Sequence, residues 1–127
     1  MNDNIEIIQR IKEVVFPVDY HIKPDRKPET TSDTGTLFES QEYDLISSAV
    51  LVPLVLRGSV WKLIMTKRSN KLKKHAGQIS LPGGKYDSRD KNLFNTALRE
   101  TSEEIGVNTN NVNIFGSLQS HETITGF

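Results

Sequence analysis

The N-terminal part of the chain places apolar residues among polar ones at the spacing of a helix. The apolar positions are Ile5, Ile8, Ile11, Val14 and Val15. Because residues three and four apart share one helix face, this pattern predicts an amphipathic helix from Asn4 to Val15, with Asp3 or Asn4 as its N-cap. The stretch His21–Glu42 has no such period and is rich in Thr, Ser, Asp and Glu, so it predicts a polar linker.

Two strand-like segments follow this linker. Ser48–Leu56 is rich in Val and Leu, and Val60–Lys67 resumes the pattern after a short turn at residues 57–59, so together they predict a β-hairpin. Pro53 has no amide hydrogen and should lie at an edge, a bulge or an unpaired position of the first strand. We therefore expect residues 1–44 to form a helix and a polar linker, and residues 45–127 to form the folded domain.

A second helix is predicted from Leu93 to Ile105, with Gly106 in the C-cap position. Its apolar arc predicts a buried face made of Phe94, Ala97, Leu98, Thr101 and Ile105. Before this helix, a short strand over residues 78–81 leads into a turn at Pro82-Gly83-Gly84, and after it residues 112–118 predict another strand.

Composition narrows the class of protein. The chain has 127 residues, of which 35% are hydrophobic and 25% charged, which fits one soluble globular domain. The longest apolar stretch, residues 49–56, is too short to cross a bilayer, so no membrane association is expected. Cysteine is absent, which excludes disulfides, thiolate zinc sites and a cysteine nucleophile. The N-terminus has no signal-peptide pattern, and a cytoplasmic location is the default expectation.

The formal net charge is zero, but the charges are unevenly distributed. Residues 45–86 carry eight basic residues and no acidic one, whereas residues 87–127 carry six acids and three bases. This layout predicts a basic wall beside an acidic one, which would suit a metal-bound phosphate ligand. The alternative is that the lysines only make a loop soluble. The zero net charge and the lack of a recognisable motif disfavour nucleic acid as a partner.

Three glutamates of the second predicted helix share one face. At 100° per residue, Glu100, Glu103 and Glu104 fall within an arc of about 100°. Like charges so close together repel, and Arg99, four residues before Glu103, balances only one of them. A hard divalent cation such as Mg²⁺, which binds carboxylate oxygens together with substrate phosphates, would balance the remainder. The alternative is a solvated acidic face.

Together these residues form a longer pattern. Gly84 is followed by a loop and then by Arg-Glu-x-x-Glu-Glu-x-Gly over Arg99–Gly106, and in this respect the chain resembles the Nudix hydrolases, with residues 84–107 as the Nudix box. Two features depart from the usual box: Asp90 stands where glutamate is typical, and Arg99 falls one residue late. One branch of the family, the coenzyme A pyrophosphatases, tolerates both of these departures, and the chain resembles that branch.

A second motif of that branch is similar to the segment between residues 63 and 84. It includes Thr66-Lys67-Arg68-Ser69, His75, Gly77-Gln78 and Pro82-Gly83-Gly84. By this resemblance the substrate-binding residues are Lys67, Arg68, Lys73, His75, Gln78, Gly83 and Gly84. Lys73 stands where arginine is common, which keeps the charge but gives up two-pronged phosphate binding.

The resemblance implies an α/β fold, namely the Nudix α/β/α sandwich with a mixed sheet, here incomplete at the C-terminal end because relatives continue well past Phe127. It implies Mg²⁺ or Mn²⁺ as cofactor, with Glu100, Glu103 and Glu104 as metal ligands. Glu103 is our nomination for the general base, and Arg99 would hold it by an ion pair. The implied reaction splits coenzyme A into 4'-phosphopantetheine and 3',5'-ADP.

Two alternatives remain open at this point. One is a Nudix hydrolase for another nucleoside diphosphate derivative, such as ADP-ribose, or for a nucleotide triphosphate. The other is a non-catalytic ligand-binding module, which the early end of the chain favours. An incomplete sheet would leave an unpaired edge that invites a homodimer, and we expect weak or absent activity from this chain alone.

Overall fold

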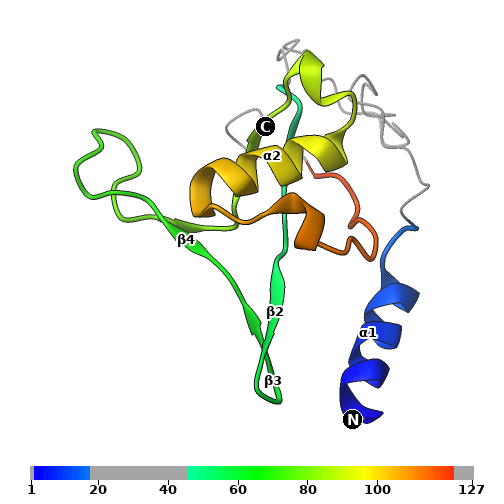
Figure 1. The fold of residues 1–127 in the computed structure, drawn as a ribbon. Coiled ribbons are helices and arrows are strands. Elements are labelled where there is room, and N and C mark those ends of the chain that lie inside the picture. The colour runs from blue at the N-terminus through cyan, green and yellow to red at the C-terminus, as the bar shows by residue number, and fades with distance from the viewer. Residues whose placement is uncertain (1, 18–45, 122–127) are drawn as a thin grey trace, which may run out of the picture.

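The computed structural model describes residues 2–17 and 46–121, which combine helices with short antiparallel strand pairs (Figure 1). The α/β class is therefore confirmed. The helices are α1 (Asn2–Val14) and α2 (Leu93–Ile105), with short 3-10 turns η1 (Ser88–Asp90) and η2 (Thr109–Asn111). The strands are β1 (Ser48–Val50), β2 (Leu54–Arg57), β3 (Val60–Leu63), β4 (Thr66–Lys67), β5 (Ile79–Ser80) and β6 (Gly83–Lys85). The predicted linker lies outside the described residues.

The strands form three antiparallel pairs, β1 with β6, β2 with β3, and β4 with β5, where one mixed sheet was expected. The predicted first strand is split at Pro53. Its beginning pairs with β6, so that Ala49 lies opposite Gly84, and its end forms the predicted hairpin with β3. The amide of Ile64 donates to the Pro53 carbonyl at 3.0 Å, which uses the only backbone hydrogen-bonding group that proline has. Of the expected alternatives of an edge, a bulge or an unpaired position, Pro53 takes one outside the strand ladders, between the end of β1 and the start of β2.

Helix α2 has the predicted bounds and lies against β1 and β6 (Figure 1). Its N-cap is Asn92, whose side chain accepts a hydrogen bond from the Asn95 amide at 2.8 Å. Its C-cap is Gly106, whose left-handed φ of 70° suits glycine. Its buried residues are Thr96, Ala97 and Thr101. Of the predicted buried face, Ala97 and Thr101 are buried and Phe94 and Leu98 are half-buried. The prediction is wrong at Ile105, which is 37% exposed because it lies in the last turn beside the cap.

Two predictions at the ends of the chain are wrong. Helix α1 begins at Asn2, so Asp3 and Asn4 lie within it and cannot be its N-cap. Residues 112–118 form no strand in the described structure and make only a single antiparallel bridge, in which Ser117 exchanges backbone hydrogen bonds with Phe16 at 2.8 and 2.9 Å. The strand-like composition of residues 112–118 is not enough to form a strand, because a β-ladder also needs a partner strand of matching length.

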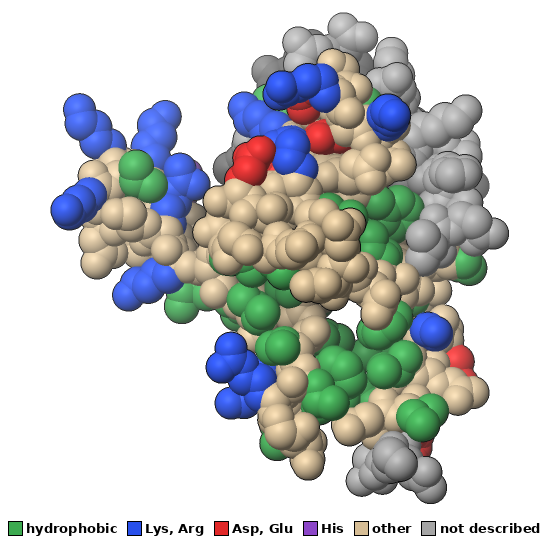
Figure 2. Space-filling model, viewed as in Figure 1, with side chains coloured by type: hydrophobic (Ala, Val, Ile, Leu, Met, Phe, Trp, Pro, Cys, Tyr) green, Lys and Arg blue, Asp and Glu red, His purple; other side chains and the backbone are tan. Residues whose placement is uncertain are grey.

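The described residues bury little apolar surface. Ala97 and Pro82 are the only buried apolar residues among them. In the β2–β3 hairpin, Val55 and Trp61 are half-buried and the other apolar side chains are exposed, namely Leu54, Leu56, Val60 and Leu63. Exposed apolar side chains accordingly gather in the centre and lower half of the face seen in Figure 2. None of the described helices is long and apolar enough to cross a bilayer. The buried polar residues Asp90, Thr96 and Thr101 instead mark the junction of η1 with α2 as the most tightly enclosed part of the described structure.

Candidate functional site

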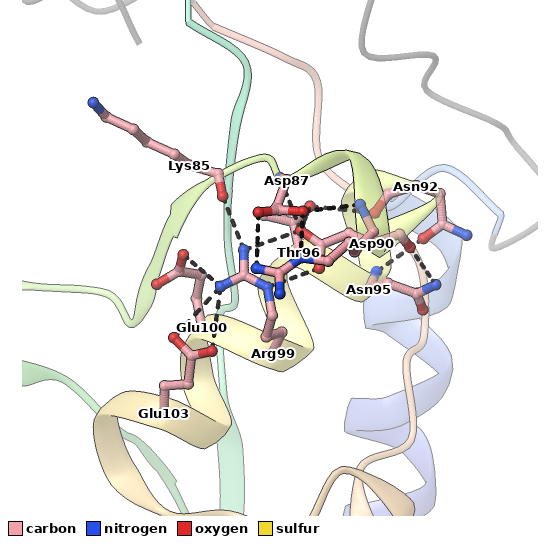
Figure 3. Close-up of polar contacts among 10 residues, drawn as sticks. Lys85, Asp87, Asp90, Asn92, Asn95, Thr96, Arg99, Glu100 and Glu103 are labelled. Atoms are coloured by element: carbon pink, nitrogen blue, oxygen red, sulfur yellow. Dashed lines mark hydrogen bonds and ion pairs between the residues drawn. The ribbon is translucent and has the colours of Figure 1, made fainter.

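A buried carboxylate lies at the centre of the junction between η1 and α2. Both oxygens of Asp90 accept from Arg99: Oδ1 from Nε at 2.7 Å and Oδ2 from Nη2 at 3.0 Å (Figure 3). Oδ2 also accepts from the Thr96 hydroxyl at 2.9 Å and from the Asp87 amide at 3.0 Å. The Asp90 side chain is only 4% exposed, so this carboxylate is held by protein groups on every side that the structure describes.

The local sequence explains how Asp90 comes to face the helix. Asp87 caps the turn η1, because its side chain accepts from the Arg89 amide at 2.9 Å while the Asp90 side chain accepts from the Asp87 amide. This reciprocal arrangement is a capping box, and it turns the Asp90 side chain inward. The Asn95 side chain then donates to the Asp90 carbonyl at 2.6 Å and joins the turn to the first turn of α2.

Arg99 connects this buried carboxylate with the predicted metal ligands. Its Nη1 donates to Glu100 Oε1 at 2.9 Å and lies 3.4 Å from each carboxylate oxygen of Glu103. Its Nη2 also donates to the Lys85 carbonyl of β6 at 3.0 Å. The predicted ion pair between Arg99 and Glu103 is therefore confirmed, but the shorter contacts of the guanidinium are those with Asp90 and Glu100.

These contacts fix the charge state of the network. The hydrogen bonds from Arg99 hold the pKa of Asp90 well below its usual value, against the opposing effect of burial. Asp90 and Glu100 in turn raise the pKa of Arg99 above its usual value. Hydrogen bonding to Arg89 lowers the pKa of Asp87 to about 2. All of these groups are consequently charged at neutral pH.

Gly84 brings β6 against the acidic face of α2. A Cβ added to Gly84 would lie 2.6 and 2.7 Å from the carboxylate oxygens of Glu100, so only glycine allows this approach. A Cβ on Gly83 would meet the backbone of Ala49 and Val50 in the same way. Glu100 is thereby partly enclosed, with its side chain 20% exposed. The two predicted substrate-binding glycines thus lie where the β1–β6 pair meets α2.

The other two glutamates are open to solvent. The Glu103 side chain is 61% exposed, and Glu104 is also exposed. Within residues 2–17 and 46–121, no three His, Asp or Glu side chains converge as a ready-made ion cage. The donor set still fits a divalent cation. Arg99 is the one base that contacts Glu100 and Glu103 in the described network, so one positive charge faces two carboxylates. Mg²⁺ takes only one or two carboxylates and keeps several waters, so it does not need a complete protein cage.

The predicted phosphate-binding side chains lie on a separate projection. Lys67 is in β4, and residues 68–78 form the exposed loop between β4 and β5. Arg68 exchanges backbone hydrogen bonds with Gly77 and Gln78 at 3.0 and 2.8 Å, and His75 takes a φ of 56°, so the loop closes on itself. Figure 2 shows its Lys and Arg side chains spread into solvent apart from the acidic side chains. The structure therefore does not bring Lys67, Arg68, Lys73, His75 and Gln78 together with α2.

The sequence pattern did not reveal the residues that organise this site. In the sequence pattern Asp90 stands out only as a departure from the typical box, and the pattern predicts no role for Asp87 or Thr96. The Asp-x-x-Asp spacing of residues 87–90 was a usable signal, since it is a capping-box pattern. The pairing of Asp90 with Thr96 and Arg99 had no comparable local signal, because it depends on the angle at which η1 enters α2.

Comparison with known proteins identifies a family for most of the described chain. Residues 46–127 match the family model described as the NUDIX domain. The chain is 44% identical over 80 residues to an uncharacterized Nudix hydrolase NudL of Yersinia enterocolitica, an alignment that covers 63% of this chain and 40% of that protein. It is similarly 44% identical to the protein of that name in Citrobacter koseri and 41% identical to the one in Pectobacterium atrosepticum, each over 63% of this chain and 41% of the relative. The matched region thus spans about two fifths of these relatives.

Proposed function

The chain belongs to the Nudix family, and on this premise we propose that it is a metal-dependent pyrophosphohydrolase of coenzyme A or its derivatives. The reaction would add water across the diphosphate and yield 4'-phosphopantetheine and 3',5'-ADP. A cytoplasmic location is part of this proposal. The family assignment supports hydrolysis of a small-molecule substrate, and members of the family generally use divalent metal ions.

The observation that carries the proposal is the excess of carboxylates around one guanidinium. Asp90, Glu100 and Glu103 all contact Arg99, while Glu104 lies exposed on the same face of α2. Asp90 alone is enough to balance Arg99, and its two hydrogen bonds to the guanidinium are short. Glu100, Glu103 and Glu104 therefore keep negative charge that a divalent cation would balance.

We assign Glu100 and Glu104 to metal binding, and Glu103 to metal binding or to activating water as general base. Arg99 is held by Asp90, and its contacts with Glu100 and Glu103 hold these two carboxylates in place. A bound Mg²⁺ or Mn²⁺ would neutralise the diphosphate and lower the pKa of water. Glu103 is assigned as the base in preference to Glu100 because its side chain has more access to water, being 61% exposed against 20%.

The loop of residues 68–78 is proposed to bind the phosphates of the substrate. Lys67, Arg68 and Lys73 are exposed and have no acidic residue near them in the sequence, so their charges are available to an anion. Coenzyme A carries a phosphate on its ribose in addition to its diphosphate. A ligand with two separated anionic groups suits a protein whose cationic loop and acidic helix lie apart.

The test is an end-point mass-spectrometric assay at high protein concentration, with coenzyme A, ADP-ribose and nucleoside triphosphates, each with and without Mg²⁺. Release of 3',5'-ADP that requires Mg²⁺ and is abolished by Glu104→Gln supports the proposal. Glu13→Gln, an exposed glutamate of α1, is the matched control and should retain turnover. Hydrolysis of another substrate but not of coenzyme A would overturn the substrate assignment. Because this chain alone is expected to be weakly active at best, the activity is overturned by the absence of both metal-dependent hydrolysis and Mn²⁺ binding that depends on Glu100 and Glu104.

A further inference from the structure

Helix α2 contains two threonines that are completely buried, Thr96 and Thr101, each with an exposed fraction of 0%. Their hydroxyls do different things. Thr101 Oγ1 donates to the Ala97 carbonyl at 2.6 Å, one turn back in the same helix. Thr96 Oγ1 lies 2.9 Å from Asp90 Oδ2, outside the helix, and 3.3 Å from the Asn92 carbonyl. A hydroxyl has one proton, and the shorter contact with the charged acceptor is the stronger one.

The contact of Thr96 matters because, apart from Arg99, the Asp90 carboxylate accepts hydrogen bonds only from Thr96 and the Asp87 amide among the described residues. Asp90 Oδ2 accepts hydrogen bonds from the Thr96 hydroxyl and the Asp87 amide. With Oδ2 held in this way, Oδ1 faces Arg99 Nε and Oδ2 faces Arg99 Nη2. This two-pronged contact sets the plane of the guanidinium. The remaining nitrogen, Nη1, then points to Glu100 and Glu103, which lie on the opposite side of Arg99 from Asp90 (Figure 3).

We infer that Thr96 is a positioning residue whose buried hydroxyl orients Asp90, and through Asp90 and Arg99 the carboxylates of Glu100 and Glu103. An aspartate at this position is one methylene shorter than a glutamate, so its reach depends more on how it is held. Thr96 supplies the holding contact from a side that solvent cannot reach. The consequence for metal binding rests on the proposed function, whereas the consequence for Arg99 does not.

The test compares Thr96→Val, which removes the hydroxyl at nearly constant volume, with Thr96→Ser, which keeps it. Thr101→Val is the matched control, because it removes an equally buried hydroxyl that bonds only within its own helix. The first measurement is hydrogen exchange at the Arg99 Nε–H by NMR, and the second is the Kd for Mn²⁺ alone, by electron paramagnetic resonance. If circular dichroism shows that Thr96→Val does not fold, Thr96→Ala replaces it.

We expect Thr96→Val to speed exchange at Arg99 Nε, and to weaken Mn²⁺ binding about tenfold, as is typical when a group that orients a metal ligand is removed. Thr96→Ser and Thr101→Val should both stay close to the unaltered chain. Equal behaviour of Thr96→Val and Thr101→Val in the exchange measurement would overturn the inference. If the unaltered chain binds no Mn²⁺ and hydrolyses nothing, the proposed function fails, and the exchange measurement still decides the role of Thr96.

Discussion

Removal of the Asp90 side chain is the most direct test of the network at the junction of η1 and α2. In Asp90→Ala, two hydrogen bonds from Arg99 are lost, together with those from Thr96 and the Asp87 amide. The Thr96 hydroxyl keeps only its 3.3 Å contact with the Asn92 carbonyl, and the Asp87 amide loses the acceptor that the capping box supplied. The change therefore affects both η1 and the helix that carries the glutamates.

The magnitude follows from the burial of Asp90. Removing one partner of a buried, hydrogen-bonded ion pair typically costs about 3–5 kcal/mol. Because Arg99 is 28% exposed and keeps Glu100 and Glu103, we expect Asp90→Ala to cost about 3 kcal/mol, the lower end of that range. Small domains are stable by only about 5–15 kcal/mol, so the loss is large.

The assay is equilibrium unfolding in urea, which leaves ionic strength unchanged, followed by the fluorescence of Trp61, the only tryptophan and half-buried in β3. With a slope of about 1–3 kcal/mol per molar urea, the expected loss moves the midpoint by about 1–3 M. Glu6→Ala is the control, since it breaks an exposed ion pair with Arg10 and should change the midpoint little. A loss of less than about 1 kcal/mol in Asp90→Ala would refute the reasoning, because a buried network cannot be that inexpensive to break.

Four further predictions test other parts of the structure. Because the folded-state pKa of Asp90 is lowered, its contribution to stability is present above about pH 4 and is lost as the pH falls through the lowered pKa. The free energy of unfolding of Asp90→Asn in urea should therefore depend less on pH below about pH 4 than that of the unaltered chain. An equal pH dependence of the two proteins would contradict this. Gly84→Ala should displace the Glu100 carboxylate and weaken Mn²⁺ binding, and an unchanged Kd would show that this close approach does not matter. Gly106→Ala should lower the free energy of unfolding in urea by about 1–2 kcal/mol, because alanine strains the left-handed backbone while nothing lies within 4 Å of the added methyl group; an unchanged urea midpoint would contradict this. In steady-state assays Lys73→Ala should raise KM for coenzyme A more than kcat falls, while Lys73→Arg should keep KM low; equal KM values in all three proteins would remove Lys73 from the substrate site.

Local signals determined some elements from the sequence alone. The bounds of α2 follow from the apolar period and from Gly106, which act within a turn of the helix, and the structure adds Asn92 as the N-cap at the predicted start. The β2–β3 hairpin follows from two apolar segments around Gly58, and its partner strands are neighbours in the chain. The pair of Arg99 with Glu103 follows from helical spacing. These features need no information about distant parts of the chain.

Only the tertiary structure decided how distant segments meet. The pattern of residues 48–56 marked a strand but did not show that its first half would leave the hairpin and pair with β6, since strand composition reports burial and not the identity of a partner. Residues 112–118 show the reverse case, a strand-like segment with a single bridge to Phe16.

The same division applies to the site. The chain order placed three glutamates and Arg99 on one helix face, because the helical repeat is a local property. It did not place Asp90 against Arg99 or bury Thr96 between η1 and α2, because those contacts depend on how the turn η1 approaches the helix. The charge run predicted a basic wall beside an acidic one, and this prediction is wrong for the loop of residues 68–78, because that loop closes on itself and lies apart from the acidic side chains of α2 (Figure 2).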